Sequence, residues 1–436
     1  MKLKRYLLMI TMVLSLFATI GCSSWFAIPF QSLSFGGSGS DMFHDAIRDS
    51  HGDYIAVGET DSGDYGIVDQ SGEEMDCDAL IVKYDSDGVM VWQKTIGDMY
   101  YEVFYSVIED SDGNYLAVGI VNNPMYVDSF MHGLMVKLDI DGNILWSHST
   151  EDVKYERYQS VIENSSHNYV VAGQIYSEET KRTEAGIWMY DTSGTMIWRT
   201  IEDSHSDYSS RFDSVIENED GNFVAVGYTY ETDGSYALST QALMAIFDSE
   251  GNRISVYTYG GGEGDRFYSI SQDKDGNYIA VGFYNGNGLE LFVSFLANAD
   301  AWIIKIDPEG NVIWDDVFGG SQADFLQSVQ VDSDGNYVAV GLTASTDYDD
   351  TDRFHEPETP SILITDGLLV KFDEDGDLIW DQLVGGVGGD LFEKLIIDKH
   401  GNYIIAGYST SEDGDLTSNH GRFDTWIWTK NSSDIE

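Results

Sequence analysis

Six acidic residues recur at one position of a repeated pattern, and a ring of carboxylates could bind a cation. Each lies four residues before a Ser-Val pair or its counterpart, at a position that one further repeat fills with Ser210. The six are Asp41, Glu102, Glu156, Asp265, Asp324 and Asp390. If the fold gathers them around one opening, a cation such as calcium would relieve their mutual repulsion. Alternatively, each carboxylate caps a local Gly-Gly turn by accepting backbone N–H bonds.

Asp-x-Asp-Gly-Asn segments are a second set of candidate calcium ligands. Residues 110–114 and 139–143 match the opening of a calcium loop. A loop of the EF-hand type also needs a Glu at its twelfth position and flanking helices, and the sequence provides neither. Because these segments lie between alternating apolar runs, Asp, Gly and Asn favour tight turns there. We interpret them as turns.

Lysines follow a further series of residues at a spacing of five. The pairs are Asp78 and Lys83, His132 and Lys137, Asp300 and Lys305, and Asp366 and Lys371. An odd spacing along a strand places the two side chains on opposite faces. We therefore expect each lysine to find its partner in a neighbouring strand.

The sequence contains no recognised catalytic motif. HExxH, a phosphate-binding loop, a CxxC pair and a nucleophile elbow are missing, and the nine histidines have no ligand spacing. We assign no catalytic residue and expect a protein that is not an enzyme. A site assembled from distant repeats is left open.

The elements that must position these residues come in seven copies. Asp-Gly-Asn-Tyr, an apolar stretch and Ala-Val-Gly recur at intervals of 54 to 66 residues. The closing glycines are Gly58, Gly119, Gly173, Gly227, Gly282, Gly341 and Gly407. Each unit adds an alternating run and two apolar runs joined by an Asp-x-x-Gly turn, which makes four short strands. This pattern predicts an all-β, seven-bladed β-propeller of four-stranded antiparallel blades.

The two ends of the chain are expected to close the ring together. The last unit stops at Glu436 before its fourth strand, whereas residues 28–41 resemble a fourth strand and its exit. Phe35-Gly36-Gly37 matches Phe318-Gly319-Gly320 at identical spacing to the next acid. The N-terminal strand should therefore complete the last blade and remove an open sheet edge.

The first residues have the features of an export signal. Three cations precede an apolar run that is too short for a membrane span and ends at Gly21-Cys22. We expect a signal peptide over 1–21, lipidation of Cys22, a linker over 22–27 and one propeller domain over 28–436. The alternative is an ordinary cleaved signal. The lipidated protein would be anchored to the bacterial cell envelope, at the outer membrane or cell surface, and Cys77 would have no disulfide partner.

The charge of the chain limits its partners. Lys and Arg number 23 against 75 Asp and Glu, and removal of the signal changes the net charge from −52 to −55. Such a field repels phosphate backbones and anionic lipid surfaces, so we expect no nucleic-acid partner and membrane contact through the lipid anchor only. It favours cations or cationic partners, or it is simply the solvated surface of an exported protein.

The repeat resembles the seven-bladed propeller repeats of bacterial and archaeal surface proteins and lipoproteins. Its Asp-x-x-Gly-x-x-x-Trp element is also similar to the docking repeat of quinoprotein-type propellers, in which the tryptophans pack between blades. The corresponding residues here are Trp92, Trp146, Trp198, Trp314 and Trp380. Ser255 and Gln31 replace the aromatic residue in two units, so we expect two gaps in this packing.

The longest insertions fall between the second and third strands, on one face of the ring. Residues 289–296 are nearly all apolar, and Leu291, Phe292 and Phe295 are candidates for a partner-binding patch, unless this segment packs on its own ring. We expect a monomeric binding or scaffolding protein that takes a protein or glycan on this loop face. The alternatives are a carbohydrate-active or quinoprotein-like enzyme and an envelope-assembly factor.

Overall fold

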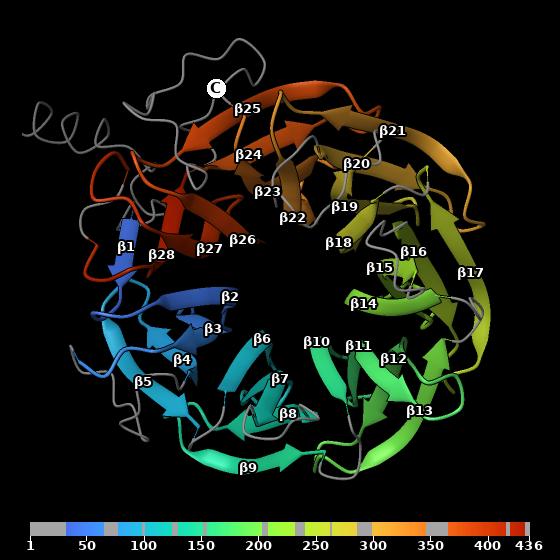
Figure 1. Ribbon diagram of the computed structural model, residues 1–436, viewed down its shortest axis with the longest axis horizontal. Coiled ribbons are helices and arrows are strands. Elements are labelled where there is room, and N and C mark those ends of the chain that lie inside the picture. Colours follow the sequence, from blue (N-terminus) through green and yellow to red (C-terminus); the bar gives the residue numbers. More distant parts are fainter. Residues whose placement is uncertain are drawn as a thin grey trace, which may run out of the picture.

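In the computed structural model the chain forms a ring of seven four-stranded sheets around a central channel (Figure 1). The structure describes residues 32–64, 77–97, 101–123, 130–150, 155–202, 208–231, 240–261, 264–285, 299–345, 365–415 and 419–431. Neighbouring strands of each sheet are antiparallel, and the described part contains no helix. The predicted seven-bladed β-propeller is confirmed.

Each blade runs from an innermost strand at the channel to an outermost strand at the rim, and blades one to seven are counted from β2. The innermost strands are β2 (Asp41–Arg48), β6 (Tyr101–Glu109), β10 (Glu156–Glu163), β14 (Tyr208–Glu217), β18 (Arg266–Gln272), β22 (Asp324–Val331) and β26 (Asp390–Ile397). The second strands are β3 (Tyr54–Thr60), β7 (Tyr115–Asn123), β11 (Tyr169–Ser177), β15 (Phe223–Glu231), β19 (Tyr278–Tyr284), β23 (Tyr337–Thr343) and β27 (Tyr403–Ser409). The third strands are β4 (Asp78–Tyr84), β8 (Phe130–Leu138), β12 (Arg182–Tyr190), β16 (Thr240–Phe247), β20 (Asp300–Ile306), β24 (Asp366–Phe372) and β28 (Asp424–Lys430). The outermost strands are β5 (Met90–Ile96), β9 (Ile144–Ser149), β13 (Met196–Glu202), β17 (Arg253–Tyr259), β21 (Val312–Phe318), β25 (Leu378–Val384) and β1 (Ser32–Phe35).

The ring closes by pairing the two ends of the described chain. β1 lies antiparallel to β28, with Ser32 opposite Trp428 and Phe35 opposite Thr425. The Thr425 hydroxyl donates to the carbonyl of Phe35 at 2.6 Å. The N-terminal strand therefore completes blade seven, as its resemblance to a fourth strand predicted. Without β1, the edge of the third strand β28 would be unpaired.

The hydrophobic core lies between blades as well as within them. The second strands are almost completely buried, and their apolar side chains meet those of the adjacent blade. One cluster joins Ile55 and Ile81 of blade one to Phe104 and Val136 of blade two. Burial of such side chains contributes about 1.5–3 kcal/mol each, so contact between blades supplies much of the stability of the ring.

The repeated tryptophans pack against the turn of the next blade. The Trp92 ring lies against Gly142, whose positive φ of 78° suits glycine in this turn. Trp146, Trp198 and Trp314 meet Gly194, Gly251 and Gly376 in the same way. In blade four, Tyr257 takes this place against Gly310, two residues after Ser255. The expected gap at blade four is therefore wrong, because a shifted tyrosine fills it; Gln31 lies outside the described residues.

The repeated lysines close the seams between blades. Lys83 in β4 pairs with Asp49 of the turn after β2 at 3.1 Å and donates to the Tyr115 hydroxyl of blade two at 2.9 Å. Lys137 meets Asp110 and Tyr169 in the same arrangement, with its ion pair at 2.7 Å. The expectation that each lysine has its partner outside its own strand is confirmed for both residues.

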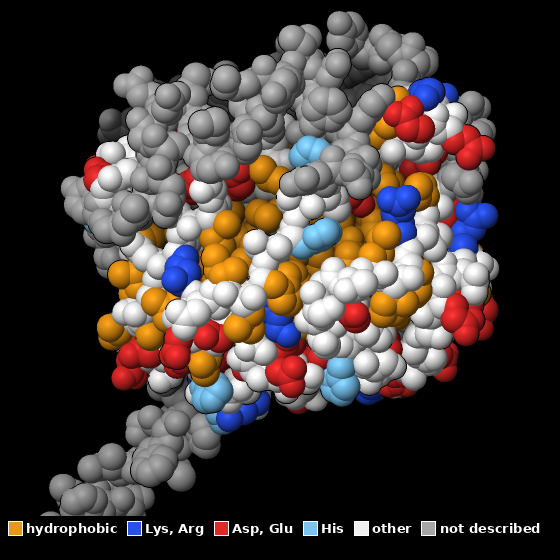
Figure 2. Space-filling view, turned by 90° about the horizontal axis from the view of Figure 1, so that it is seen from below, with side chains coloured by type: hydrophobic (Ala, Val, Ile, Leu, Met, Phe, Trp, Pro, Cys, Tyr) orange, Lys and Arg blue, Asp and Glu red, His pale blue; other side chains and the backbone are white. Residues whose placement is uncertain are grey.

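The outer wall exposes apolar side chains where the outermost strands begin (Figure 2). Ile144 and Leu145 of β9 are each 51% exposed. The corresponding pairs Met90 and Val91, Met196 and Ile197, Val312 and Ile313, and Leu378 and Ile379 are also exposed. Among the described residues, none forms a helix long and apolar enough to cross a membrane.

Candidate functional site

A β-bulge in every innermost strand sets one side chain toward the channel. In β2 the pairing with β3 shifts register between Phe43 and Asp45, so His44 has no residue opposite it. The same shift occurs in the other six blades. The unpaired residues, here called the bulge ring, are His44, Tyr105, Gln159, Asp213, Tyr268, Gln327 and Glu393.

The closing glycine of each repeat makes room for this bulge. A Cβ on Gly58 would lie 1.8 Å from the carbonyl oxygen of Met42, and one on Gly282 would lie 1.9 Å from that of Arg266. A side chain there would collide with the bulged strand, so only glycine allows the close approach. The closing glycines, from which the period of the repeat was read, therefore also shape the channel wall.

The residue after each bulge forms a second ring that ties the blades together. Its members are Asp45, Ser106, Ser160, Ser214, Ser269, Ser328 and Lys394. The Ser106 hydroxyl accepts the N–H of Val161 in the next blade at 3.3 Å. In blade one, Asp45 accepts the N–H of Val107 at 2.9 Å and pairs with Lys394 of blade seven at 3.0 Å. Most of this ring is therefore used in joining blades.

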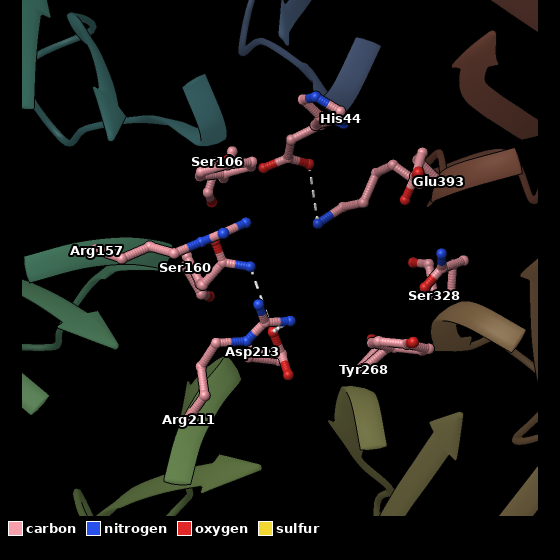
Figure 3. Close-up of a pocket in the computed structure, with 16 residues that line it drawn as sticks. His44, Ser106, Arg157, Ser160, Arg211, Asp213, Tyr268, Ser328 and Glu393 are labelled. Carbon is pink, nitrogen blue, oxygen red and sulfur yellow. Dashed lines mark hydrogen bonds and ion pairs between the residues drawn. The ribbon is translucent and has the colours of Figure 1, made fainter. Parts of the chain in front are cut away.

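The two rings and two arginines enclose a cavity of about 310 Å³ at the centre of the propeller (Figure 3). Arg157 and Arg211 stand two residues before their bulges, at the end of the channel where the innermost strands begin. Ligand pockets in proteins begin at about this volume, so the cavity would fit a small molecule.

A polar chain links the two arginines across blades three and four (Figure 3). Arg157 Nε donates to Gln159 at 2.6 Å, and Gln159 in turn donates to Asp213 at 3.3 Å. Asp213 pairs with Arg211 at 2.6 Å, and these two side chains are 5% and 16% exposed. The guanidinium of Arg157 also stacks on Tyr105, 4.3 Å from the ring centre. Its terminal nitrogens have no acceptor among the described residues.

Several channel side chains retain unused hydrogen-bonding capacity. Tyr105, Tyr268, Gln327 and Glu393 make no hydrogen bond to another described residue. These four side chains are half-buried, and polar groups withdrawn from bulk solvent are usually satisfied, so their position around one cavity marks a place where water or a ligand binds.

Burial sets the protonation states in the channel. It raises the pKa of Glu393 to about 7, and burial with the nearby Arg157 cation lowers the pKa of His44 to about 4. Burial also raises the pKa of Tyr268 to about 12. At neutral pH the imidazole is therefore uncharged, Glu393 is partly protonated, and both arginines are cations.

The channel departs from the charge of the rest of the chain. Its lining carries Arg157, Arg211 and Lys394 against three acids, whereas the whole chain has 23 cations against 75 acids. Because Lys394 and Asp45 neutralise each other and Glu393 is partly protonated, the wall of blades three and four has a positive balance. Guanidinium groups bind planar or tetrahedral oxyanions well.

A third arginine extends this wall. Arg266 of blade five stacks on Tyr228 at 4.2 Å, and Arg211 lies over the same ring at 5.0 Å. Nε of Arg211 and Nε of Arg266 are buried without a hydrogen-bond partner in the described part of the chain. Three successive blades therefore present arginine at the same position of the innermost strand.

The six acids of the repeated pattern are placed at turns and do not line the cavity. Asp41, Asp265, Asp324 and Asp390 each accept the N–H of the glycine four residues earlier at 2.7 Å. The turn-capping alternative therefore describes these four. Glu102 is also buried, near Asp78 on either side of Gly97, and Glu156 is buried at the start of β10.

The structure brings several of these acids beside an acid of the preceding blade instead of beside one another. Asp41 lies near Asp424 at Gly36, and Asp324 lies near Asp300 at Gly319. Burial and Asp424 raise the pKa of Asp41. Among the described residues, the one group of three or more ligands within metal-binding reach is Asp49, His51 and Glu109. Calcium binding by the six acids stays a prediction.

The remaining candidates lie outside the described residues. These are Cys22 and the apolar patch of Leu291, Phe292 and Phe295. The channel residues were missed because the repeats were compared by their common letters. When the innermost-strand segments are aligned position by position, arginine recurs at residues 157, 211 and 266, as in ERYQSV, SRFDSV and DRFYSI. The residue directly before the Ser differs from one segment to the next.

Comparison with known proteins adds a partial family match. Residues 159–319 match the family model for arylsulfotransferase (ASST), a segment that contains Arg211, Asp213 and Tyr268. The match covers less than half of the chain. An uncharacterized WD repeat-containing protein L264 of Acanthamoeba polyphaga mimivirus is 24% identical over 32% of this chain, which spans 12% of that relative's length.

Similar solved structures are distant. A protein of unknown function from Dyadobacter fermentans is 12% identical, with 91% of this chain and 97% of that chain covered and a TM-score of 0.44. The β-propeller domain of the Trilobed protease from Pyrococcus furiosus is 11% identical, with 92% and 96% covered and a TM-score of 0.43. The resemblance to surface-protein repeats stays a prediction.

Proposed function

We propose that the protein binds a small, anion-bearing ligand in its central channel, with Arg157 and Arg211 as the anion site. The observation that carries the proposal is a 310 Å³ cavity in which Arg157 offers guanidinium nitrogens that no described acceptor uses. Arg211 supplies a second cation, held in place by Asp213 at 2.6 Å. The partial match to an arylsulfotransferase model supports a sulfate-type anion.

Titration calorimetry at low ionic strength tests this proposal with inorganic sulfate and 4-nitrophenyl sulfate as probes. We expect saturable binding that Arg157→Gln weakens about tenfold or more, because a hydrogen-bonded charge contributes about 1.5–3 kcal/mol. Lys274→Gln is the control, since Lys274 is a 64% exposed cation outside the channel that pairs with the similarly exposed Glu374. Equal affinity in the wild type and Arg157→Gln would refute the channel site.

A second candidate function is transfer of a sulfuryl group between aryl alcohols. The family match favours it, and so does an uncharged His44 imidazole beside Arg157. In this reaction a His44 nitrogen would bond to sulfur as the S–O bond to the departing aryl oxygen breaks. The oxygen of the acceptor phenol would then bond to sulfur as the N–S bond breaks and the phenol proton is released to water, and in both steps the arginines would stabilise the oxyanion charge. Release of 4-nitrophenol from 4-nitrophenyl sulfate with phenol as acceptor, lost in His44→Asn, is the expected result. The seven blades do not fit the eight-bladed ring that a quinoprotein would have.

The cellular setting in this proposal is an exported lipoprotein anchored at Cys22, with the loop face available to a protein or glycan. Support comes from the sequence of the first 22 residues and from β1, which begins ten residues after Cys22. Membrane fractionation of a Cys22→Ser variant checks the anchor, because that variant should appear in the non-membrane fraction. An envelope-assembly role would instead show as co-purification with membrane-protein machinery.

A further inference from the structure

The wall opposite the arginines carries a carboxyl group that the anion site leaves unused. Glu393 lines the cavity beside β26 of blade seven, while Arg157 and Arg211 enter from the other side (Figure 3). No described residue donates a hydrogen bond to Glu393 or forms an ion pair with it. Glu393 is half-buried, and a carboxyl withdrawn from bulk solvent without a donor is costly unless a ligand or water satisfies it.

The ring geometry separates the two kinds of charge. Blade seven lies next to blade one and across the channel from blade four, so β26 and β2 face β14 and β18 (Figure 1). The arginines that stand two residues before a bulge belong to blades three, four and five, where Asp213 pairs with Arg211, whereas Glu393 and the more deeply placed Glu59 belong to blades seven and one. The ion pair of Lys394 with Asp45 at 3.0 Å is neutral as a unit and leaves this separation intact.

We propose that the channel ligand is bipolar, with an anionic group held by Arg157 and Arg211 and an ammonium or other hydrogen-bond donor held by Glu393. This inference rests on the proposed anion site and narrows its ligands to molecules such as amino-sulfonates or amino-carboxylates. One such molecule satisfies both the free guanidinium nitrogens of Arg157 and the carboxyl of Glu393. The cavity volume of about 310 Å³ fits a compact ligand of this kind.

The groups around Glu393 allow its contribution to be isolated. His44, Gln327 and Lys394 line the same cavity, and Glu59 and Tyr408 lie behind it on the second strands. His44, with a pKa of about 4, does not change charge between pH 6 and 8. Glu59 accepts the Tyr101 hydroxyl at 2.6 Å and does not line the cavity. Glu393, with a pKa of about 7, titrates in this range.

The experiment is calorimetry of the full mature protein with 3-aminopropane-1-sulfonate and its deaminated counterpart, propane-1-sulfonate. Both sulfonates are anionic and the amine is protonated from pH 6 to 8. We expect the amino ligand to bind about tenfold more tightly than the deaminated one at pH 8, and its affinity to fall about tenfold at pH 6, where Glu393 is protonated. Propane-1-sulfonate should change little with pH.

Two variants assign the effect. Glu393→Gln should bring the amino ligand to the affinity that propane-1-sulfonate has for the same variant, and it should remove the dependence on pH. Glu250→Gln is the matched control, because Glu250 lies on an exposed turn of blade four. Melting temperatures of both variants establish that they are folded.

The outcomes separate this inference from the proposed function. If propane-1-sulfonate binds in an Arg157-dependent way and the amino group adds no affinity, the bipolar ligand is refuted and the anion site stands. If the amino group adds affinity that Glu393→Gln leaves intact, Glu393 is not its partner and the inference is also refuted. If neither sulfonate binds, both the anion site and the bipolar ligand are overturned.

Discussion

The two ends of the innermost strands follow opposite rules. Where the strands end, the seams repeat the same solution, with Lys83, Asp49 and Tyr115 between blades one and two and Lys137, Asp110 and Tyr169 between the next two. In the middle of the strands, the seven bulges present five different types of side chain, and five of the seven side chains make no hydrogen bond within the described chain. The seam residues, which recur together with their partners, hold the ring together. The residues of the bulge ring vary although their backbone setting is the same in every blade, and they are available to bind a ligand.

The largest expected effect comes from breaking a seam. Lys83→Ala removes the cation paired with Asp49, whose side chain is completely buried, and leaves that carboxylate without its ion-pair partner in blade one. We expect a loss of about 3–5 kcal/mol in the free energy of unfolding, measured by denaturant titration. Anion binding by the remaining folded protein should be unchanged, because Lys83 does not line the channel.

An exposed pair supplies the control for the seam. Lys274 and Glu374 lie 3.6 Å apart with side chains 64% and 61% exposed, so Lys274→Ala should have little effect on unfolding. Equal destabilisation by Lys83→Ala and Lys274→Ala would contradict the view that the buried seam, and not charge in general, stabilises the ring.

A smaller loss is expected from closing the space that a bulge needs. Gly282→Ala places a Cβ 1.9 Å from the Arg266 carbonyl oxygen, so β18 must shift or lose its bulge. We expect about 1–3 kcal/mol of destabilisation and weaker anion binding together, since the same bulge sets Tyr268 toward the cavity. Denaturant unfolding and sulfate titration of the same sample provide both readouts.

The control for this change is Gly261→Ala. Its nearest neighbour would be the Tyr284 hydroxyl at 3.4 Å, an ordinary contact, so stability and binding should both be retained. Loss of stability with intact binding in Gly282→Ala would show that the bulge does not position the channel residues.

The same contrast explains what could be predicted from the sequence. Blade number, strand order and ring closure follow from letters that recur with fixed spacing, and so does the expectation that Lys83 and Lys137 have partners outside their own strands, although not which residues those partners are. The channel was not predicted, because a bulge shifts the side-chain alternation by one residue and because its seven residues have no common type. The aromatic contact of blade four was missed for a related reason, since Tyr257 reaches Gly310 from two residues beyond the repeated position.

The smallest effect has the opposite sign and belongs to the channel. Glu393 has a pKa of about 7 in the folded protein against an ordinary value of 4.5, so the folded state holds a proton that the unfolded chain has released between these pH values. Folding stability therefore falls as pH rises from about 4.5 to 7, and this penalty then stays constant. Because the carboxyl lines a cavity that water can enter, we expect a penalty of about 1–2 kcal/mol at pH 8.

Glu393→Gln should accordingly stabilise the fold by about that amount at pH 8 and leave it unchanged at pH 4, which thermal melts at the two pH values would measure. A variant equally stabilised at both pH values would act through packing and not through charge. The predicted gain in stability also distinguishes the channel from the seams, because removal of a charged side chain stabilises the fold at Glu393 and destabilises it at Lys83. A carboxyl retained against the stability of the fold needs another reason for its presence, and binding the donor end of a channel ligand supplies one.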